Sequence, residues 1–197
     1  MRVDELGHAC KDGAKVDEEQ ARALLDDDGY LRSASQAPLA LSGAYLVFSQ
    51  ANGVTLDMLA WQRQATRFFQ SRVGLALPKK SGRSVADSDA YLLMVEAPNT
   101  PVARRLLWLR PRTSDDLDLA QRIESAKGSR GMSDLATRCS GVCLIESEGP
   151  DDRAALVLAG LAASILLGPI VPPTHDEIYG VRTAREKLEA LGAAAYR

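Results

Sequence analysis

The sequence predicts a mixed fold of the α+β class, with a ferredoxin-like core over residues 44–147. Between these bounds, short apolar runs alternate with amphipathic helical stretches in the order strand, helix, strand, strand, helix, strand. Beyond them, no charged residue occurs from 154 to 173, which indicates a helix buried against the sheet. The chain of 197 residues, 46% of them hydrophobic, is long enough for a single domain with a sizeable core.

Residues 1–40 predict a small helical appendage ahead of this core. Its better-marked helix begins at Asp17, which can form a capping box with Gln20. One side of that helix is an apolar stripe of Ala21, Leu24 and Leu25. The pattern fits two roles for the appendage, because such a helix can cap the core or be presented to a partner.

Four core strands are predicted from runs rich in Val, Leu, Ile, Tyr and Phe. They cover residues 44–49, 91–97, 105–110 and 142–146, and residues 73–77 are a candidate short strand. The short connection between the second and third strands predicts that they pair in antiparallel fashion. In the ferredoxin-like arrangement, the second and fourth strands form opposite edges of the sheet and both helices cover one face.

Two amphipathic helices are predicted between these strands. The first covers about residues 55–72 and has one apolar face of Met58, Trp61, Ala65 and Phe68. The second covers residues 114–127, where Thr113 and Asp116 have capping-box spacing and Gly128 follows the last turn.

Residues 150–197 predict two further helices, at about 151–167 and 175–191. The second and third core strands are apolar on both faces, so these C-terminal helices are expected to pack on the sheet and cover it. The final helix is predicted to begin in a capping box of Thr174 and Glu177.

The uncharged run at 154–173 also raises the question of a membrane span. Its glycines and prolines leave about fourteen residues of good helix, fewer than the roughly 20 that cross a bilayer. We therefore expect a buried helix and no contact with a membrane.

Charge and cysteine content restrict the partners and the compartment. The chain has 24 basic and 26 acidic residues and no long block of like charge, so no nucleic-acid partner is expected. Three cysteines and an acidic N-terminus argue against a secreted protein and favour the cytoplasm. Arginine outnumbers lysine 18 to 6, a bias that suggests a bacterial source with a GC-rich genome.

The cysteines and histidines form no recognisable metal site or nucleophile motif. Zinc ribbons favour C-x2-C pairs, whereas Cys139 and Cys143 are spaced C-x3-C and Cys143 falls inside an apolar strand. A thiol nucleophile needs a base, and only His175 remains as a partner for either cysteine across the fold. No metal and no cofactor are predicted.

Glu96 and Glu146 each end an apolar strand, and a pair of carboxylates can perform acid–base chemistry. In the ferredoxin-like order these strands are edges about 14 Å apart, so the carboxylates are not expected to meet. His175 lies in the predicted capping box and is left as a ligand or pH-sensitive group.

The sequence favours a module that binds through its surface over an enzyme, because no catalytic motif occurs in a chain with a well-supplied core. The expected partner is another bacterial protein, as for an immunity, chaperone or regulatory protein, or a second copy. A sheet edge or the Met58–Phe68 helix surface would make the contact. The alternative is an enzyme whose site draws on His175, Cys139, Cys143, Glu96 and Glu146, with His175, Cys143 and Glu146 as catalytic candidates.

Overall fold

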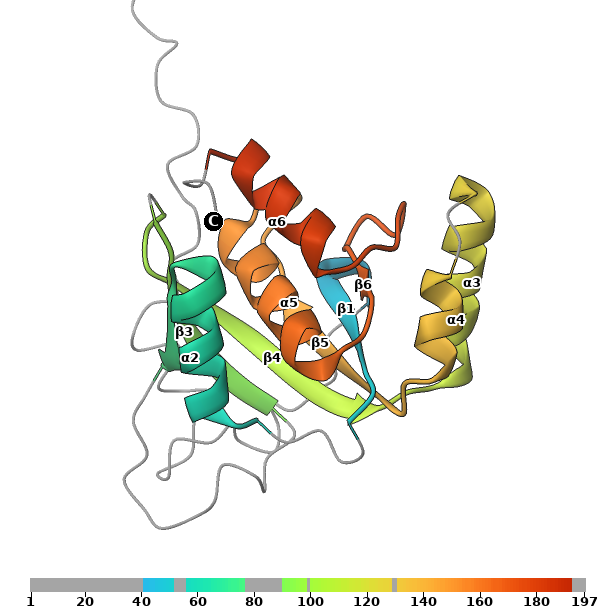
Figure 1. Ribbon diagram of the computed structural model, residues 1–197, viewed down its shortest axis with the longest axis horizontal. Helices are drawn as coiled ribbons and strands as arrows, with labels where there is room; N and C mark the ends of the chain where they lie inside the picture. Colours follow the sequence, from blue (N-terminus) through green and yellow to red (C-terminus); the bar gives the residue numbers. More distant parts are fainter. Residues whose placement is uncertain (1–40, 52–55, 77–89, 99, 129–130, 193–197) are drawn as a thin grey trace, which may run out of the picture.

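The computed structural model describes residues 41–51, 56–76, 90–98, 100–128 and 131–192 (Figure 1). Within them the chain forms one six-stranded antiparallel sheet and five α-helices. The strands are β1 (Ala44–Ser49), β2 (Arg72–Leu75), β3 (Ala90–Glu96), β4 (Ala103–Pro111), β5 (Gly141–Glu146) and β6 (Ile170–Val171). The helices are α2 (Met58–Phe69), α3 (Ser114–Lys127), α4 (Met132–Thr137), α5 (Arg153–Leu166) and α6 (Val181–Ala190), and a 3-10 turn, η2 (Leu41–Gly43), precedes β1. The α+β class is confirmed, and the predicted appendage at 1–40 lies outside the described residues.

The ferredoxin-like strand order predicted for 44–147 is wrong. The sheet order is β2-β3-β4-β5-β1-β6, so β5 lies between β4 and β1, and β3 and β5 are not opposite edges. The physical reason is β2, which follows α2 and pairs with β3. This extra strand reverses the direction of β3 relative to β1, and β5 then returns antiparallel to β4.

The two sheet faces carry separate helix layers, and the predicted placement of both core helices on one face is therefore also wrong. We call the first face the α5 face, because Tyr45 and Val47 of β1 pack there with α2, α5 and α6. The second is the α3 face, where Leu46 and Phe48 pack with residues of α3 and α4. Side chains alternate along a strand, so β1 contributes to both layers. Figure 1 shows α5 and α6 apart from α3 and α4.

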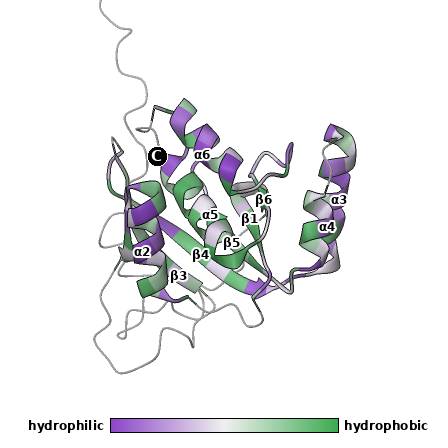
Figure 2. Cartoon of the chain, in the orientation of Figure 1, coloured by the Kyte–Doolittle hydropathy of each residue, from purple (hydrophilic) through white to green (hydrophobic). Residues whose placement is uncertain are grey.

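The prediction that the uncharged run forms a buried helix on the sheet is confirmed by α5. This helix contacts β1, β3, β4 and β5 and lies beside α6. It is largely green and white in Figure 2, whereas α6 shows purple segments. Gly160 lets α2 approach closely, since a Cβ there would lie 2.8 Å from the Phe69 ring. Among the described residues, no helix has the length and apolar character needed to cross a membrane.

The final helix begins later than the sequence predicts. Thr174 and Glu177 form no capping box, because the chain from Pro172 turns and returns to β6 before α6 begins at Val181. Ile170 and Tyr179 exchange two backbone hydrogen bonds, of 2.7 and 3.0 Å, across this turn. This non-local pairing satisfies backbone groups that a longer helix would have satisfied internally.

Helix α3 has the predicted bounds and the predicted capping box, and Asp116 does more than cap it. The Asp116 carboxylate accepts two hydrogen bonds of 2.7 Å from the Arg110 guanidinium and one of 2.8 Å from the Thr113 N–H. Burial by itself raises the pKa of Asp116, but the bonds from Arg110 and Thr113 more than offset this effect. The net result is a pKa below the ordinary 3.8.

Asp116→Asn is expected to lower the free energy of unfolding by about 2 kcal/mol at pH 7, because the ionised acceptor of charge-assisted bonds is lost. A depressed folded-state pKa adds stability above the unfolded pKa, and this stability is lost as the pH falls through the folded value. The difference between the two proteins should therefore be full above about pH 5 and shrink below pH 3.8. Urea unfolding of both proteins, above pH 5 and below pH 3.8, measures this difference in stability. Asp118→Asn, on the exposed side of α3, should change stability by less than about 0.5 kcal/mol.

Candidate functional site

His175 lies in the turn between β6 and α6, where it is half-buried. Its backbone is left-handed, with φ of 53°, and its N–H donates to the Pro172 carbonyl at 3.0 Å. The ring Nε2 lies 3.0 Å from the Leu41 carbonyl oxygen of η2. In this position the ring links the turn to the start of β1.

The two described cysteines are buried on opposite faces of the sheet. Cys143 is on β5 within the α5-face cluster, and Cys139 belongs to the α3-face cluster. Burial raises the pKa of the Cys143 thiol far above its ordinary value. Burial also raises the pKa of Cys139, against an opposing effect from Arg112. Protonated thiols enclosed in apolar surroundings are poor nucleophiles and poor metal ligands.

Glu96 and Glu146 have separate partners. The Glu146 carboxylate accepts a hydrogen bond of 3.1 Å from the Leu106 N–H, at the point where the β4–β5 ladder ends. Glu96 forms an exposed ion pair of 3.7 Å with Arg72 of β2. The expected separation by opposite edges is wrong, because only β4 lies between β3 and β5. Even so, no contact joins the two carboxylates.

The structure does not bring the five candidate catalytic residues together. Among the described residues, no hydrogen bond or ion pair joins any two of His175, Cys139, Cys143, Glu96 and Glu146. The described part of the chain also contains no group of three or more His, Cys, Asp or Glu residues placed to hold a metal ion.

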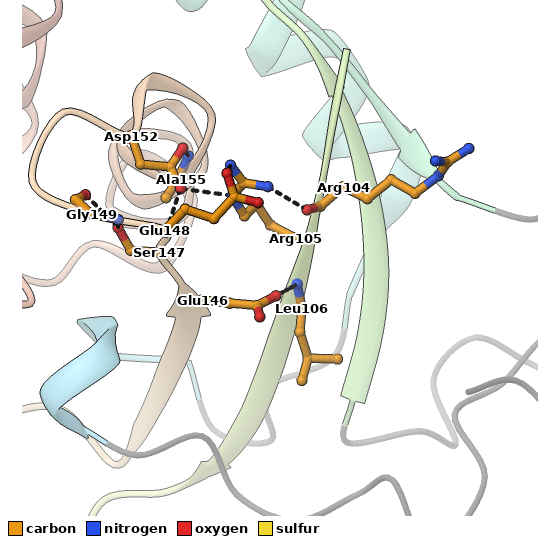
Figure 3. Close-up of polar contacts among 9 residues, drawn as sticks. All are labelled: Arg104, Arg105, Leu106, Glu146, Ser147, Glu148, Gly149, Asp152 and Ala155. Carbon is orange, nitrogen blue, oxygen red and sulfur yellow. Dashed lines mark hydrogen bonds and ion pairs between the residues drawn. The ribbon is translucent and has the colours of Figure 1, made fainter. Parts of the chain in front are cut away.

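The most connected polar group is a buried ion network that the sequence did not reveal (Figure 3). Arg105 of β4 is 6% exposed and donates through Nε to Asp152 at 2.7 Å. Its Nη2 lies 2.8 Å from Glu148, and its Nη1 donates to the Arg104 carbonyl at 2.7 Å. Burial by itself lowers the pKa of Arg105, but the bond to Asp152 and the charges of both acids raise it overall.

Asp152 joins this network to the start of α5. Its Oδ1 caps the helix by accepting from the Ala155 N–H at 3.0 Å, and its Oδ2 accepts from the Glu148 N–H at 2.9 Å. Among the described residues, no buried side-chain nitrogen or oxygen of Arg105 or Asp152 lacks a hydrogen-bond partner. The network holds the β5–α5 connection against β4. Arg105 and Asp152 are 47 residues apart in the sequence, so local patterns did not reveal their pairing.

The Met58–Phe68 side of α2 is not an open apolar surface. Trp61, Ala65 and Phe69 face the core, while Met58 and Phe68 are partly buried against the same cluster. The guanidinium groups of Arg67 and Arg185 lie 5.0 and 5.1 Å from the centre of the Phe68 ring. These cation–π contacts cover what the sequence suggested as a binding face.

An apolar surface is present instead on the α3 face of the outer strands, and we call it the sheet-face patch. Facing residues of an antiparallel pair lie on one side of the sheet. The register of β2, β3 and β4 therefore places Gly74, Met94 and Arg104 side by side, and Leu106 opposite Leu92. We define the patch as the following residues: Arg72 and Gly74 of β2, Met94 and Glu96 of β3, Arg104, Leu106 and Trp108 of β4, and Val102, which directly precedes β4.

The patch contains two of the four large apolar side chains that are exposed among the described residues. Met94 is 38% exposed and Val102 is 57% exposed, whereas Leu59 and Leu167 lie singly elsewhere. Arg104 is half-buried, and its guanidinium makes no hydrogen bond or ion pair with the described residues. In Figure 3 its side chain extends away from the Arg105 network.

The patch lies at one end of the sheet, where β2 is the last strand. At the other end, the outer side of β6 is occupied by Tyr179 through its two bonds to Ile170. The described chain therefore blocks one sheet edge with its own backbone and places its clustered exposed apolar residues near the other.

Comparison of the chain with family models, with curated proteins and with solved structures finds no match.

Proposed function

We propose that this chain is a single-domain binding module that acts by contact with another protein, and that the sheet-face patch is its contact surface. The partner is a second protein, as for an immunity, chaperone or regulatory protein of a bacterial cytoplasm, or another copy of the chain. The low cysteine content, three in 197 residues, is what supports that location.

One observation carries the proposal: on one side of the sheet, two exposed apolar side chains lie near a guanidinium that has no partner among the described residues. Isolated exposed apolar residues are ordinary on protein surfaces, but neighbouring ones are typical of contact sites. Met94 and Val102 flank Arg104, and arginine is enriched at protein interfaces. A partner that covers these three side chains buries apolar area and supplies an acceptor for the guanidinium.

The proposal is tested with the double variant Met94→Glu/Val102→Glu of the full chain. Size-exclusion chromatography with light scattering at micromolar concentration, and affinity capture from the source cells, should show a stoichiometric complex with the unchanged protein. The double variant should weaken this complex at least about a hundredfold, because two carboxylates then enter an apolar contact.

The matched control is Leu59→Glu/Leu167→Glu, which places the same two charges at exposed apolar positions outside the patch. This control should retain the complex. The absence of any complex, or equal loss in both double variants, would contradict the proposed function.

A further inference from the structure

We propose that the sheet-face patch binds an acidic amphipathic helix, and that residues 17–28 of this same chain occupy it. This inference rests on the proposed function, since it names an occupant for the same surface. An intramolecular occupant then competes with an external partner for the patch.

Residues 17–28 have the composition of a segment that docks one side on an apolar surface. Ala21, Leu24 and Leu25 fall at steps of three and one, which places them on one side of a helix. Around them the segment has six acidic residues and one basic residue, Arg22. A segment of this kind requires an apolar surface with an accessible cation.

The patch supplies both features. Met94 and Val102 provide exposed apolar area, and the Arg104 guanidinium is the charged group of the patch that has no hydrogen bond or ion pair with the described residues. Two carboxylates of the described strands are already engaged, Glu96 with Arg72 and Glu146 with a backbone N–H. An added carboxylate at this position would therefore pair with Arg104 without displacing an existing contact.

The course of the chain places residues 17–28 within reach of the patch. Leu41, where the described chain begins, packs against the α3-face cluster, and Trp108 of the patch packs against that same cluster. The segment therefore joins the fold on the correct side of the sheet. The twelve residues 29–40 can span up to ~40 Å, whereas β1 and β3 are three strand spacings, ~14 Å, apart.

The test measures the reactivity of a thiol introduced by Met94→Cys in the full chain, with Cys10→Ser to remove the N-terminal thiol. Labelling is followed by peptide mass spectrometry, alone and combined with Leu24→Glu/Leu25→Glu. Breaking the apolar stripe should raise the labelling rate at position 94 at least about tenfold, and this change should not depend on protein concentration. The same stripe variant should also increase capture of an external partner.

Two controls make the test specific. A thiol introduced by Leu59→Cys on α2 should label at the same rate with and without the stripe variant, which also reports that the fold is intact. A charge exchange provides a second route. Arg104→Glu should raise the labelling at position 94, and adding Asp26→Arg, Asp27→Arg and Asp28→Arg should restore protection.

Equal labelling at position 94 with and without the stripe variant would overturn the inference. Protection that grows with protein concentration would also overturn it, in favour of a second copy as the occupant. These failures are distinct from failure of the proposed function, which is the absence of any complex sensitive to Met94→Glu/Val102→Glu.

Discussion

Gly168→Ala is expected to lower the free energy of unfolding by about 4 kcal/mol or to prevent folding. A Cβ at Gly168 would lie 2.0 Å from the carbonyl oxygen of Phe48 and 2.5 Å from its carbonyl carbon. Both atoms belong to the backbone of β1, in the interior of the sheet, so no side-chain rotation can relieve the overlap.

The segment around Gly168 is also held where it is by its own hydrogen bonds. The Phe48 N–H donates to the Pro169 carbonyl at 3.0 Å, and the Gln50 N–H donates to the Leu166 carbonyl at 2.9 Å. The Gln50 side chain adds a bond of 2.7 Å to the Leu167 carbonyl. Moving the segment away from β1 to admit a methyl group would break these bonds and detach β6 from the sheet edge.

Urea unfolding followed by circular dichroism measures the effect as a shift of the midpoint at unchanged slope. The matched control is Gly43→Ala, in η2 directly before the same strand, where an added Cβ meets nothing within 4 Å. This control should change stability by less than about 1 kcal/mol. A Gly168→Ala protein as stable as the control would show that the α5–β6 connection is not held against β1 as described.

Asp152→Ala is expected to cost about 3–5 kcal/mol, because it leaves the buried guanidinium of Arg105 without its closest counter-charge. The same substitution removes the N-cap of α5 and the acceptor of the Glu148 N–H. The cap alone accounts for about 1 kcal/mol of this total.

A double-mutant cycle separates these contributions. Arg105→Met removes the buried cation and keeps an apolar side chain of similar length, while Asp152→Ser keeps a hydroxyl cap. The combined variant should therefore be more stable than Asp152→Ala alone. Glu148→Gln, at a half-exposed position of the same network, should cost less than about 1 kcal/mol. Equal costs for Asp152→Ala and Glu148→Gln would mean that the network is not buried.

The positions of most helices and strands could be predicted because each depends on residues close in sequence. The capping box of Thr113 and Asp116 and the αL residue Gly128 define both ends of α3. The absence of charge from 154 to 173 was enough to predict that α5 is buried. The predicted beginning of α6 was wrong. Local capping signals predicted helix from about residue 175, but Tyr179 pairs with Ile170 and its backbone groups are satisfied there instead.

The strand order and the candidate surface could not be predicted by the same means. Four residues, Arg72–Leu75, form β2, and whether so short a segment pairs depends on β3, about 20 residues later. Once β2 pairs, β3 and β4 reverse and the ferredoxin-like order no longer applies. The exposure of Met94 likewise depends on register, since a slip of one residue would turn it into the core.

The sequence by itself determined the α+β class, the places of the four core strands and the burial of α5, because propensity, periodicity and capping act within one or two turns of the chain. Only the tertiary structure decided the strand order, the pairing of Arg105 with Asp152, and the gathering of Met94, Val102 and Arg104 into one patch. These features join residues on different strands and helices. Strand pairing and register therefore determine these features, and both depend on the free energy of the whole fold.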